Sequence, residues 1–220
     1  ENFLLFENVD GNFPNHHPDP SDPKNLEDCI NLIKKKKLDC GIAFDGDGDR
    51  IGVIDDKGRV LSGDQLLLLF SYEILKRKKG AKIIGDVKCS QVLFDEIKKK
   101  HGIPIISQTG HSHVKTNIKK NRADLAGEMS GHIFFNFDYY GFDDALYSSV
   151  KLVELLDNQG KKLSEIVDRF PKVFNTPEIR VECDDLKKFE IINKVIANQK
   201  IKNQEVIDID GIRVSSENGW

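Results

Sequence analysis

The chain has 220 residues, and its 33 Lys and Arg nearly balance its 36 Asp and Glu, which gives a formal net charge of -3. This charge argues against a nucleic-acid-binding protein, and 31% charged with 8% aromatic residues fits neither a disordered chain nor a membrane protein. The longest apolar run, Leu66–Phe70, is far too short to span a bilayer. We expect a cytoplasmic protein whose four cysteines are reduced, because none has C-x-x-C spacing.

Strand and helix patterns alternate along the chain. In the first unit they predict a strand at 3–6, a helix from Pro23 to about Lys36 with Asp22 as its N-cap, and strands at 40–44 and 51–54. In the second unit they predict helices at 64–78, 90–100, 112–120, 143–157 and 163–169, strands at 82–86 and 103–107, and a strand pair around 124–137. After Pro171 they predict a strand at 178–183, a helix at 185–198 and strands at 205–214.

This alternation predicts an α/β fold made of consecutive mixed, largely parallel sheets covered by helices. An incomplete α+β unit is expected to follow at the C-terminal end. We place the units at residues 1–59, 60–171 and 172–220. Ligands of such sheets bind beyond the carboxyl ends of the strands, so we search there for functional residues.

Asp45, Asp47 and Asp49 alternate with glycines in the run D-G-D-G-D-R, between two apolar segments that resemble strands. Three adjacent carboxylates repel one another unless a cation lies among them, and hard ions such as Mg²⁺ take oxygen ligands. A solvated acidic turn is the plain alternative, but the glycines, the flanking strands and Arg50 argue against it. A calcium EF-hand is excluded, because Arg50 replaces the glycine that its loop needs and no helix follows. The pattern predicts a Mg²⁺ site.

Further polar residues suit a phosphoryl group in transfer. Its transition state spreads negative charge over several oxygens, which a divalent metal, Arg, Lys and His together stabilise. A glutamate and a serine on a glycine-flanked turn suit sugar hydroxyls, because the carboxylate accepts hydrogen bonds and the serine both donates and accepts. The candidates for these roles are Arg50, Lys88, His111, Glu128, Ser130 and His132.

Five segments carry these residues and their surroundings: D-G-N-F-P-N-H-H-P-D-P (10–20), A-F-D-G-D-G-D-R (43–50), D-V-K-C-S (86–90), T-G-H-S (109–112) and A-G-E-M-S-G-H-I-F-F (126–135). In this order they resemble the α-D-phosphohexomutases, most closely the bacterial phosphomannomutase/phosphoglucomutase branch. The resemblance implies an internal piece of a four-domain enzyme, comprising the second and third domains and the start of the fourth. The family's T-A-S-H-N-P-like loop, whose serine is phosphorylated, has no counterpart in these 220 residues.

The resemblance implies an enzyme that interconverts hexose 1-phosphate and 6-phosphate, of mannose or glucose, through a phosphoserine and a bisphosphorylated sugar. The N- and C-terminal domains of the same enzyme would be its partners. The aspartates would bind Mg²⁺, and Arg50 would neutralise charge on the moving group. The residues implied to bind the phosphoryl group or transfer a proton are Lys88, His111 and His132, and those implied to bind ring hydroxyls are Glu128 and Ser130.

Two alternatives stay open. A phosphoglucosamine mutase of the same fold usually has Gln where this chain has Met129, and a non-catalytic sugar-phosphate or metal-binding module would need no phosphoserine. We also interpret Asp143 as a helix cap, and expect Glu128 and Ser130 to alternate along an extended segment with their side chains on one side. The pair at 16–17, two adjacent histidines, is not assigned to a metal, because no third ligand stands at a fitting spacing.

Overall fold

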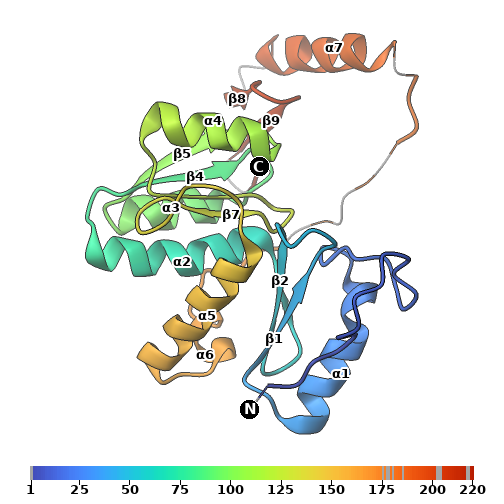
Figure 1. The fold of residues 1–220 in the computed structure, drawn as a ribbon. Coiled ribbons are helices and arrows are strands. Elements are labelled where there is room, and N and C mark those ends of the chain that lie inside the picture. Colours follow the sequence, from blue (N-terminus) through green and yellow to red (C-terminus); the bar gives the residue numbers. More distant parts are fainter. Residues whose placement is uncertain are drawn as a thin grey trace.

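The computed structural model describes residues 2–174, 176, 179, 181–184, 186–201, 205–216 and 219–220. The strands within this part form a three-stranded sheet, a four-stranded sheet and a two-stranded sheet, in that order along the chain (Figure 1). None of the helices in the same part has the length and apolar character needed to span a bilayer. The α/β class predicted from the sequence is confirmed.

The first sheet is an antiparallel meander of β1 (Cys40–Phe44), β2 (Ile51–Asp55) and β3 (Val60–Leu61). Its connections, residues 45–50 and 56–59, are too short for the crossover of about a dozen residues that parallel strands need. The first sheet is therefore entirely antiparallel, whereas the sequence predicted largely parallel sheets. Because β3 belongs to it, the sheet extends past the predicted boundary at residue 59.

One helix covers the outer face of this sheet. It is α1 (Glu27–Lys36), preceded by the short 3-10 helix η1 (Pro23–Leu26). Asp22 caps η1, because its Oδ1 accepts the N–H of Lys24 at 3.0 Å. The predicted cap and helix are thus confirmed. The strand predicted at residues 3–6 is wrong, since these residues pair with no strand in the described part and Leu4 is 74% exposed.

The second sheet has the order β5-β4-β6-β7, with β4 (Lys82–Asp86), β5 (Ile103–Ser107), β6 (Leu125–Gly127) and β7 (Ile133–Phe135). The first three run parallel and β7 runs antiparallel to β6. Adjacent side chains along a strand face opposite sides. Accordingly Ile83 packs in the core shared with α2 (Gly63–Arg77) and α3 (Gln91–Lys99), whereas Ile84 packs with α4 (His111–Asn121). Helices therefore cover both faces, as predicted.

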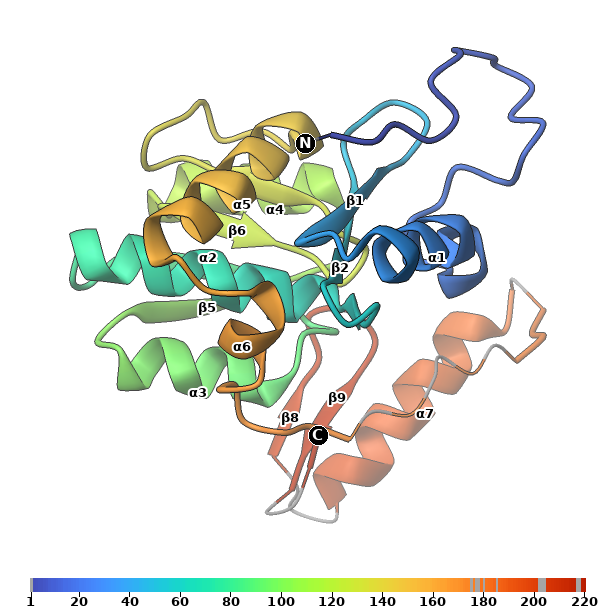
Figure 2. The same ribbon diagram turned by 90° about the horizontal axis from the view of Figure 1, so that it is seen from below.

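Helix α2 lies at the centre of the molecule, between the second sheet and helices α5 (Ala145–Gln159) and α6 (Leu163–Val167) (Figures 1 and 2). All of Leu66–Phe70 is buried, because neighbours surround the helix on every side of that stretch. One core cluster joins α2 to Val53 of the first sheet and Ile83 of the second. This shared core holds the two sheets in a fixed relation.

Helix α7 (Lys188–Ile201) and the antiparallel strands β8 (Glu205–Ile207) and β9 (Arg213–Ser215) follow. The predicted helix and strand pair are confirmed in outline. The strand predicted at 178–183 is absent at its described residues 179 and 181–183, and its other positions lie outside the described part. The division at residue 171 stays a prediction.

We expect Leu67→Ala to lower the free energy of unfolding by about 2–5 kcal/mol, because Leu67 is fully buried in α2 and its truncation leaves a cavity. Leu146→Ala is the matched control, a leucine on helix α5 that is 62% exposed and should change stability by less than about 0.5 kcal/mol. Urea denaturation of both variants measures the difference. Equal losses would mean that α2 is not the centre of the core.

Candidate active site

The hairpin loop between β1 and β2, residues 45–50, brings the three aspartates together. Gly48 adopts a φ of 74°, in the left-handed region that glycine favours, and this lets the chain reverse. One carboxylate oxygen from each of Asp45, Asp47 and Asp49 lies within 4.8 Å of the others. A hard cation with oxygen ligands fits that spacing. We call residues 45–50 the carboxylate loop.

Arg50 and Asp45 close the carboxylate loop. Oδ1 of Asp45 accepts the N–H groups of Asp49 at 3.0 Å and Arg50 at 3.1 Å, and its Oδ2 accepts Nε–H of Arg50 at 2.7 Å. Nη1 of Arg50 also donates to Asp19 at 3.0 Å. The arginine that the sequence assigned to a moving phosphoryl group is therefore already paired with two carboxylates.

The aspartates of the loop differ in their acidity. Burial acts to raise the pKa of Asp45, but the hydrogen bonds from Arg50 lower it below its ordinary value. The pKa of Asp49 is raised, by burial and by the carboxylates of Asp45 and Asp47. A cation bound among these carboxylates would offset both the burial and the repulsion that raise the pKa of Asp49.

The carboxylate loop is fastened to the second unit through main-chain hydrogen bonds. The N–H of Ile51 donates to the carbonyl of Gly131 at 3.1 Å, and the N–H of Ala145 donates to the carbonyl of Gly48 at 3.1 Å. Gly131 has a φ of 98°, and a Cβ there would lie 2.6 Å from the Ile51 carbonyl oxygen. Only glycine allows this close approach.

The turn between β6 and β7, residues 128–132, lies directly against the carboxylate loop. We call it the glutamate turn. Nε2 of His132 lies 3.3 Å from Asp49, and its Nδ1 lies 3.1 Å from Glu128 Oε2 and 2.8 Å from Ser130 Oγ. The Glu128 side chain is 1% exposed, and its Oε1 accepts the N–H of Gly110 at 2.6 Å. His132 therefore bridges the two sets of carboxylates.

The extended geometry expected for Glu128 and Ser130 is wrong. The N–H of Glu128 donates to the carbonyl of His132 at 3.0 Å, and the N–H of Gly131 donates to the carbonyl of Glu128 at 3.1 Å. These bonds close a tight turn, which the positive φ of Gly131 makes possible. Ser130 faces the imidazole of His132 as a result.

The imidazole of His132 favours its protonated form. Burial acts to lower its pKa, but the adjacent carboxylate of Glu128, with Asp49 and Asp143 nearby, raises it above the ordinary value. His111, the first residue of α4, stacks on it with ring centroids 5.8 Å apart and an interplanar angle of 15°. Two histidines from different elements thus share one end of the site.

Asp143 is part of this cluster and is not the helix cap that the sequence suggested. The cap of α5 is Asp144, whose Oδ1 accepts the N–H of Tyr147 at 2.8 Å. The Asp143 side chain instead points toward α4, where its Oδ1 lies 2.7 Å from Nζ of Lys115 and its Oδ2 lies 3.3 Å from Nδ1 of His111. Its side chain is 5% exposed, so it holds His111 from a buried position.

Lys88 is the exposed residue of an otherwise buried turn after β4, at the carboxyl edge of the parallel strands. The loop that bears His111 follows β5, and the glutamate turn follows β6, so all three end at this edge. Beneath Lys88, the buried carboxylate of Asp86 accepts the N–H of Cys89 at 3.1 Å and that of Met129 at 3.4 Å. The topology therefore collects the predicted residues at one edge, as the rule for such sheets requires.

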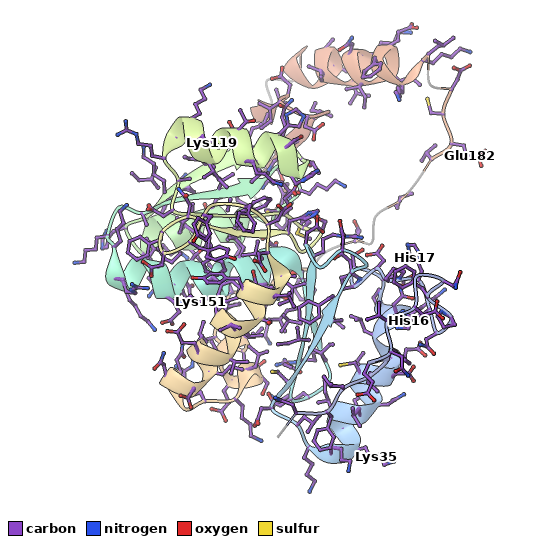
Figure 3. The ribbon with its side chains drawn as sticks, in the orientation of Figure 1. His16, His17, Lys35, Lys119, Lys151 and Glu182 are labelled. Atoms are coloured by element: carbon purple, nitrogen blue, oxygen red, sulfur yellow. The ribbon has the colours of Figure 1, made fainter. Side chains whose placement is uncertain are left out.

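The two adjacent histidines 16 and 17 lie in the N-terminal segment beside α1 (Figure 3). Nδ1 of His16 contacts the carbonyl of His17 at 2.9 Å, and the His16 ring packs edge-on against Phe6. Neither histidine belongs to a group of possible metal ligands within the described residues. Lys35, in the basic run at the end of α1, points away from the body into solvent (Figure 3).

Sequence reasoning missed three residues of the site: Asp19, Lys115 and Asp143. Asp19 lies in a P-D-P turn far from Arg50 in sequence, so no spacing signal links the two. Lys115 stands one helical turn after His111, and this i, i+4 relation places both on one face of α4. That relation is a signal that could have found it.

Comparisons with known proteins agree on one family. The description "Phosphoglucomutase/phosphomannomutase, alpha/beta/alpha domain II" matches residues 3–58, and that for domain III matches residues 62–174. A phosphomannomutase/phosphoglucomutase of Pseudomonas syringae pv. tomato is 46% identical over 216 residues, covering 98% of this chain and 46% of that protein. A phosphoglucomutase of Neisseria gonorrhoeae is 43% identical over 218 residues, covering 98% and 47%.

Solved structures agree as well. The crystal structure of a phosphoglucomutase/phosphomannomutase family protein from Burkholderia thailandensis has a TM-score of 0.89 and 43% identity, covering 97% of this chain and 45% of that one. The chain spans about half the length of the relatives it matches. The carboxylate loop lies within the first matched range, and Lys88, His111 and the glutamate turn lie within the second.

We expect Gly131→Ala to destabilise the protein by about 2–4 kcal/mol, because alanine would be strained at this φ and its Cβ would strike the Ile51 carbonyl. Gly160→Ala is the control. It also has a positive φ, but nothing lies within 4 Å of its Cβ position, so strain alone should cost about 1 kcal/mol. Thermal and urea unfolding measure both, and indistinguishable losses would show that the junction at Gly131 does not hold the two units.

Proposed function

Because this chain belongs to the phosphoglucomutase/phosphomannomutase family, we propose that it supplies the cation site and the sugar-phosphate site of a hexose phosphomutase. Such an enzyme moves a phosphoryl group reversibly between O1 and O6 of mannose or glucose. The 220 residues contain no T-A-S-H-N-P-like serine loop, so the phosphoserine of the reaction would come from outside this sequence.

The contact between the carboxylate loop and the glutamate turn carries the proposal. Asp49, His132 and Glu128 form a continuous chain of contacts at 3.3 and 3.1 Å. A candidate cation site therefore adjoins a buried carboxylate that suits a hydroxyl-rich ligand. A phosphorylated sugar needs both surfaces at once, because its phosphate is anionic and its ring is neutral and polar.

The donor set of the carboxylate loop fits Mg²⁺. It consists of carboxylate oxygens only, and Mg²⁺ prefers such ligands and keeps waters where protein ligands are lacking. Asp45, Asp47 and Asp49 would hold the ion, because one carboxylate oxygen of each lies within 4.8 Å of the others. When bound, Mg²⁺ supplies positive charge beside a phosphoryl oxygen.

The cationic side chains would surround the phosphoryl group. Lys88 is itself exposed at the edge of the sheet, and the His111 side chain is 55% exposed, so both can meet a ligand. Arg50 is held by Asp45 and Asp19, which fixes its charge beside the loop. Such fixed charges stabilise a developing anion because they need no rearrangement during the reaction.

The glutamate turn would bind the ring hydroxyls. In the described part of the chain, Oε2 of Glu128 has no hydrogen-bond donor of good geometry, although His132 lies 3.1 Å away. A buried acceptor in this condition favours a ligand donor such as a sugar hydroxyl. Ser130 Oγ, 2.8 Å from the same imidazole, can add a second hydrogen bond.

A histidine would move the proton of the attacking or leaving hydroxyl. His132 is placed between Glu128 and Asp49, which stabilise its protonated form. That protonated imidazole can give a proton to a leaving oxygen and then accept one from the next hydroxyl. His111, stacked on it and held by Asp143, would bind the phosphoryl group from the same end of the site.

We expect Asp47→Asn to weaken Mg²⁺ binding roughly tenfold, equivalent to about 1.4 kcal/mol, because one charged ligand is lost. Asp47 is exposed, so stability should be unchanged. Isothermal calorimetry with MgCl₂ measures the affinity. Asp157→Asn, an exposed aspartate on α5, is the control and should bind like the unmutated chain. Equal heats for the two variants would refute the assignment of the cation to this loop.

We expect Glu128→Gln to weaken the binding of glucose 1-phosphate, measured with Mg²⁺ present, by about tenfold or more, because a charged acceptor of hydroxyl groups is lost. Glu96→Gln is the matched control. Glu96 is 8% exposed and accepts hydrogen bonds from Tyr72 and Lys99, away from the site. Should both variants bind the sugar phosphate as the unmutated chain does, the glutamate turn is not the sugar site.

A further inference from the structure

The C-terminal hairpin, residues 205–216, reaches back onto the two loops that carry Lys88 and His111. It comprises β8, β9 and the turn between them. Its contacts are with main-chain and glutamine side-chain groups of those loops, close to the candidate residues in sequence.

Arg213 forms the first contact. Its Nη1 donates to the carbonyls of Val87 at 2.8 Å and Cys89 at 2.5 Å, the residues on either side of Lys88. Its Nη2 donates to Oε1 of Gln91 at 3.1 Å. The guanidinium therefore binds the main chain immediately before and immediately after Lys88, with the fixed geometry that arginine provides.

Arg213 is buried between two aromatic rings. Arg213 is 5% exposed, and its guanidinium lies 5.6 Å from the Phe94 ring and 5.7 Å from the Trp220 ring. Burial lowers its pKa, partly opposed by the charge of Asp86 beneath the same turn. A buried charge needs hydrogen-bond partners, and Arg213 finds them in the carbonyls of Val87 and Cys89 and in the Gln91 side chain.

The turn of the hairpin forms the second contact, with the loop that leads to His111. The N–H of Thr109 donates to Oδ2 of Asp210 at 3.0 Å, and the Gln108 amide donates to the carbonyl of Ile209 at 2.6 Å. On its other side, this loop donates the N–H of Gly110 to Glu128. The loop is thus held between the hairpin and the glutamate turn.

We propose that the C-terminal hairpin positions both phosphate-facing loops, with Arg213 as the positioning residue for Lys88 and Asp210 as the positioning residue for His111. This rests on the proposed function for the identity of the ligand. The hairpin follows residue 171 and the loops precede it, so the site depends on chain from both parts. Any displacement of the hairpin would move Lys88 and His111 together.

Amide hydrogen exchange on the 220-residue chain tests the positioning without any ligand. Arg213→Met should speed exchange at Cys89 and Ser90 by about tenfold or more, and Asp210→Ala should speed exchange at Thr109 by about threefold or more, since each removes hydrogen bonds to that loop. The effects should be separate, each variant acting most on its own loop. Arg169→Met, at an exposed arginine, is the control and should leave both loops unchanged.

A double-mutant cycle tests the link to Lys88, with glucose 1,6-bisphosphate and MgCl₂ as the probe. Arg213→Met and Lys88→Met should each weaken binding about tenfold, and the double variant should be no more than about twofold weaker than Lys88→Met alone. Fully additive losses would show that Arg213 does not act through Lys88 and would overturn the proposal. Unchanged exchange in both loops would overturn it too.

Two outcomes need a second measurement: an Arg213→Met variant that does not fold, and an unmutated chain that does not bind the bisphosphate. If Arg213→Met does not fold, Arg213→Lys, which keeps the charge but fewer donors, should give intermediate exchange at the Lys88 turn. If the unmutated chain does not bind the bisphosphate, the proposed function fails for this chain, whereas the exchange measurements still decide whether the hairpin positions the loops. The two failures are therefore distinguishable.

Discussion

The hydrogen bond from the N–H of Ile51 to the carbonyl of Gly131 is the constraint on which the site depends. It joins the first strand after the carboxylate loop to the glutamate turn of the second sheet. Because both partners are main-chain atoms and Gly131 has no Cβ, the two elements approach more closely than side chains would allow. The contacts of His132 with Asp49 and Glu128 follow from this junction.

Charge is distributed unevenly across the junction. Three carboxylates gather on the hairpin of the first sheet with Arg50, whereas the second unit supplies cations that already have carboxylate neighbours: Lys115 and His111 beside Asp143. The aspartates of the hairpin repel one another in the absence of a cation, and the exposed side chains of Lys88 and His111 can meet an anionic group. A phosphorylated ligand with a divalent cation would supply both missing charges, which is why the two halves suit this chemistry together.

The carboxylate loop could be predicted from the sequence because its three ligands are neighbours in the chain and glycines force the turn. Lys88 and His111 could be placed because each follows a predicted strand, and the carboxyl ends of parallel strands meet at one edge, whereas Glu128 was indicated by its glycine-flanked turn with Ser130. These inferences need only local patterns and one rule of topology.

Asp19, Asp143 and Arg213 could not be found in this way, because their partners are distant in sequence and depend on how the units dock. Asp143 and Asp144 are chemically identical neighbours, and only the direction of α5 decides which one caps the helix. The geometry of Glu128 and Ser130 was misjudged because alternation along a sequence fits an extended strand and a closed turn equally well, until the partners of the backbone N–H groups are known.

The central claim is that the carboxylate loop and the glutamate turn form one site for a sugar phosphate. A crystal of the chain soaked with MnCl₂ and glucose 1-phosphate, measured at the manganese absorption edge, tests it most directly. The account predicts an anomalous peak among the carboxylates of Asp45, Asp47 and Asp49, with sugar density continuing toward Glu128. A peak at another place, or sugar density away from the glutamate turn, would contradict the account.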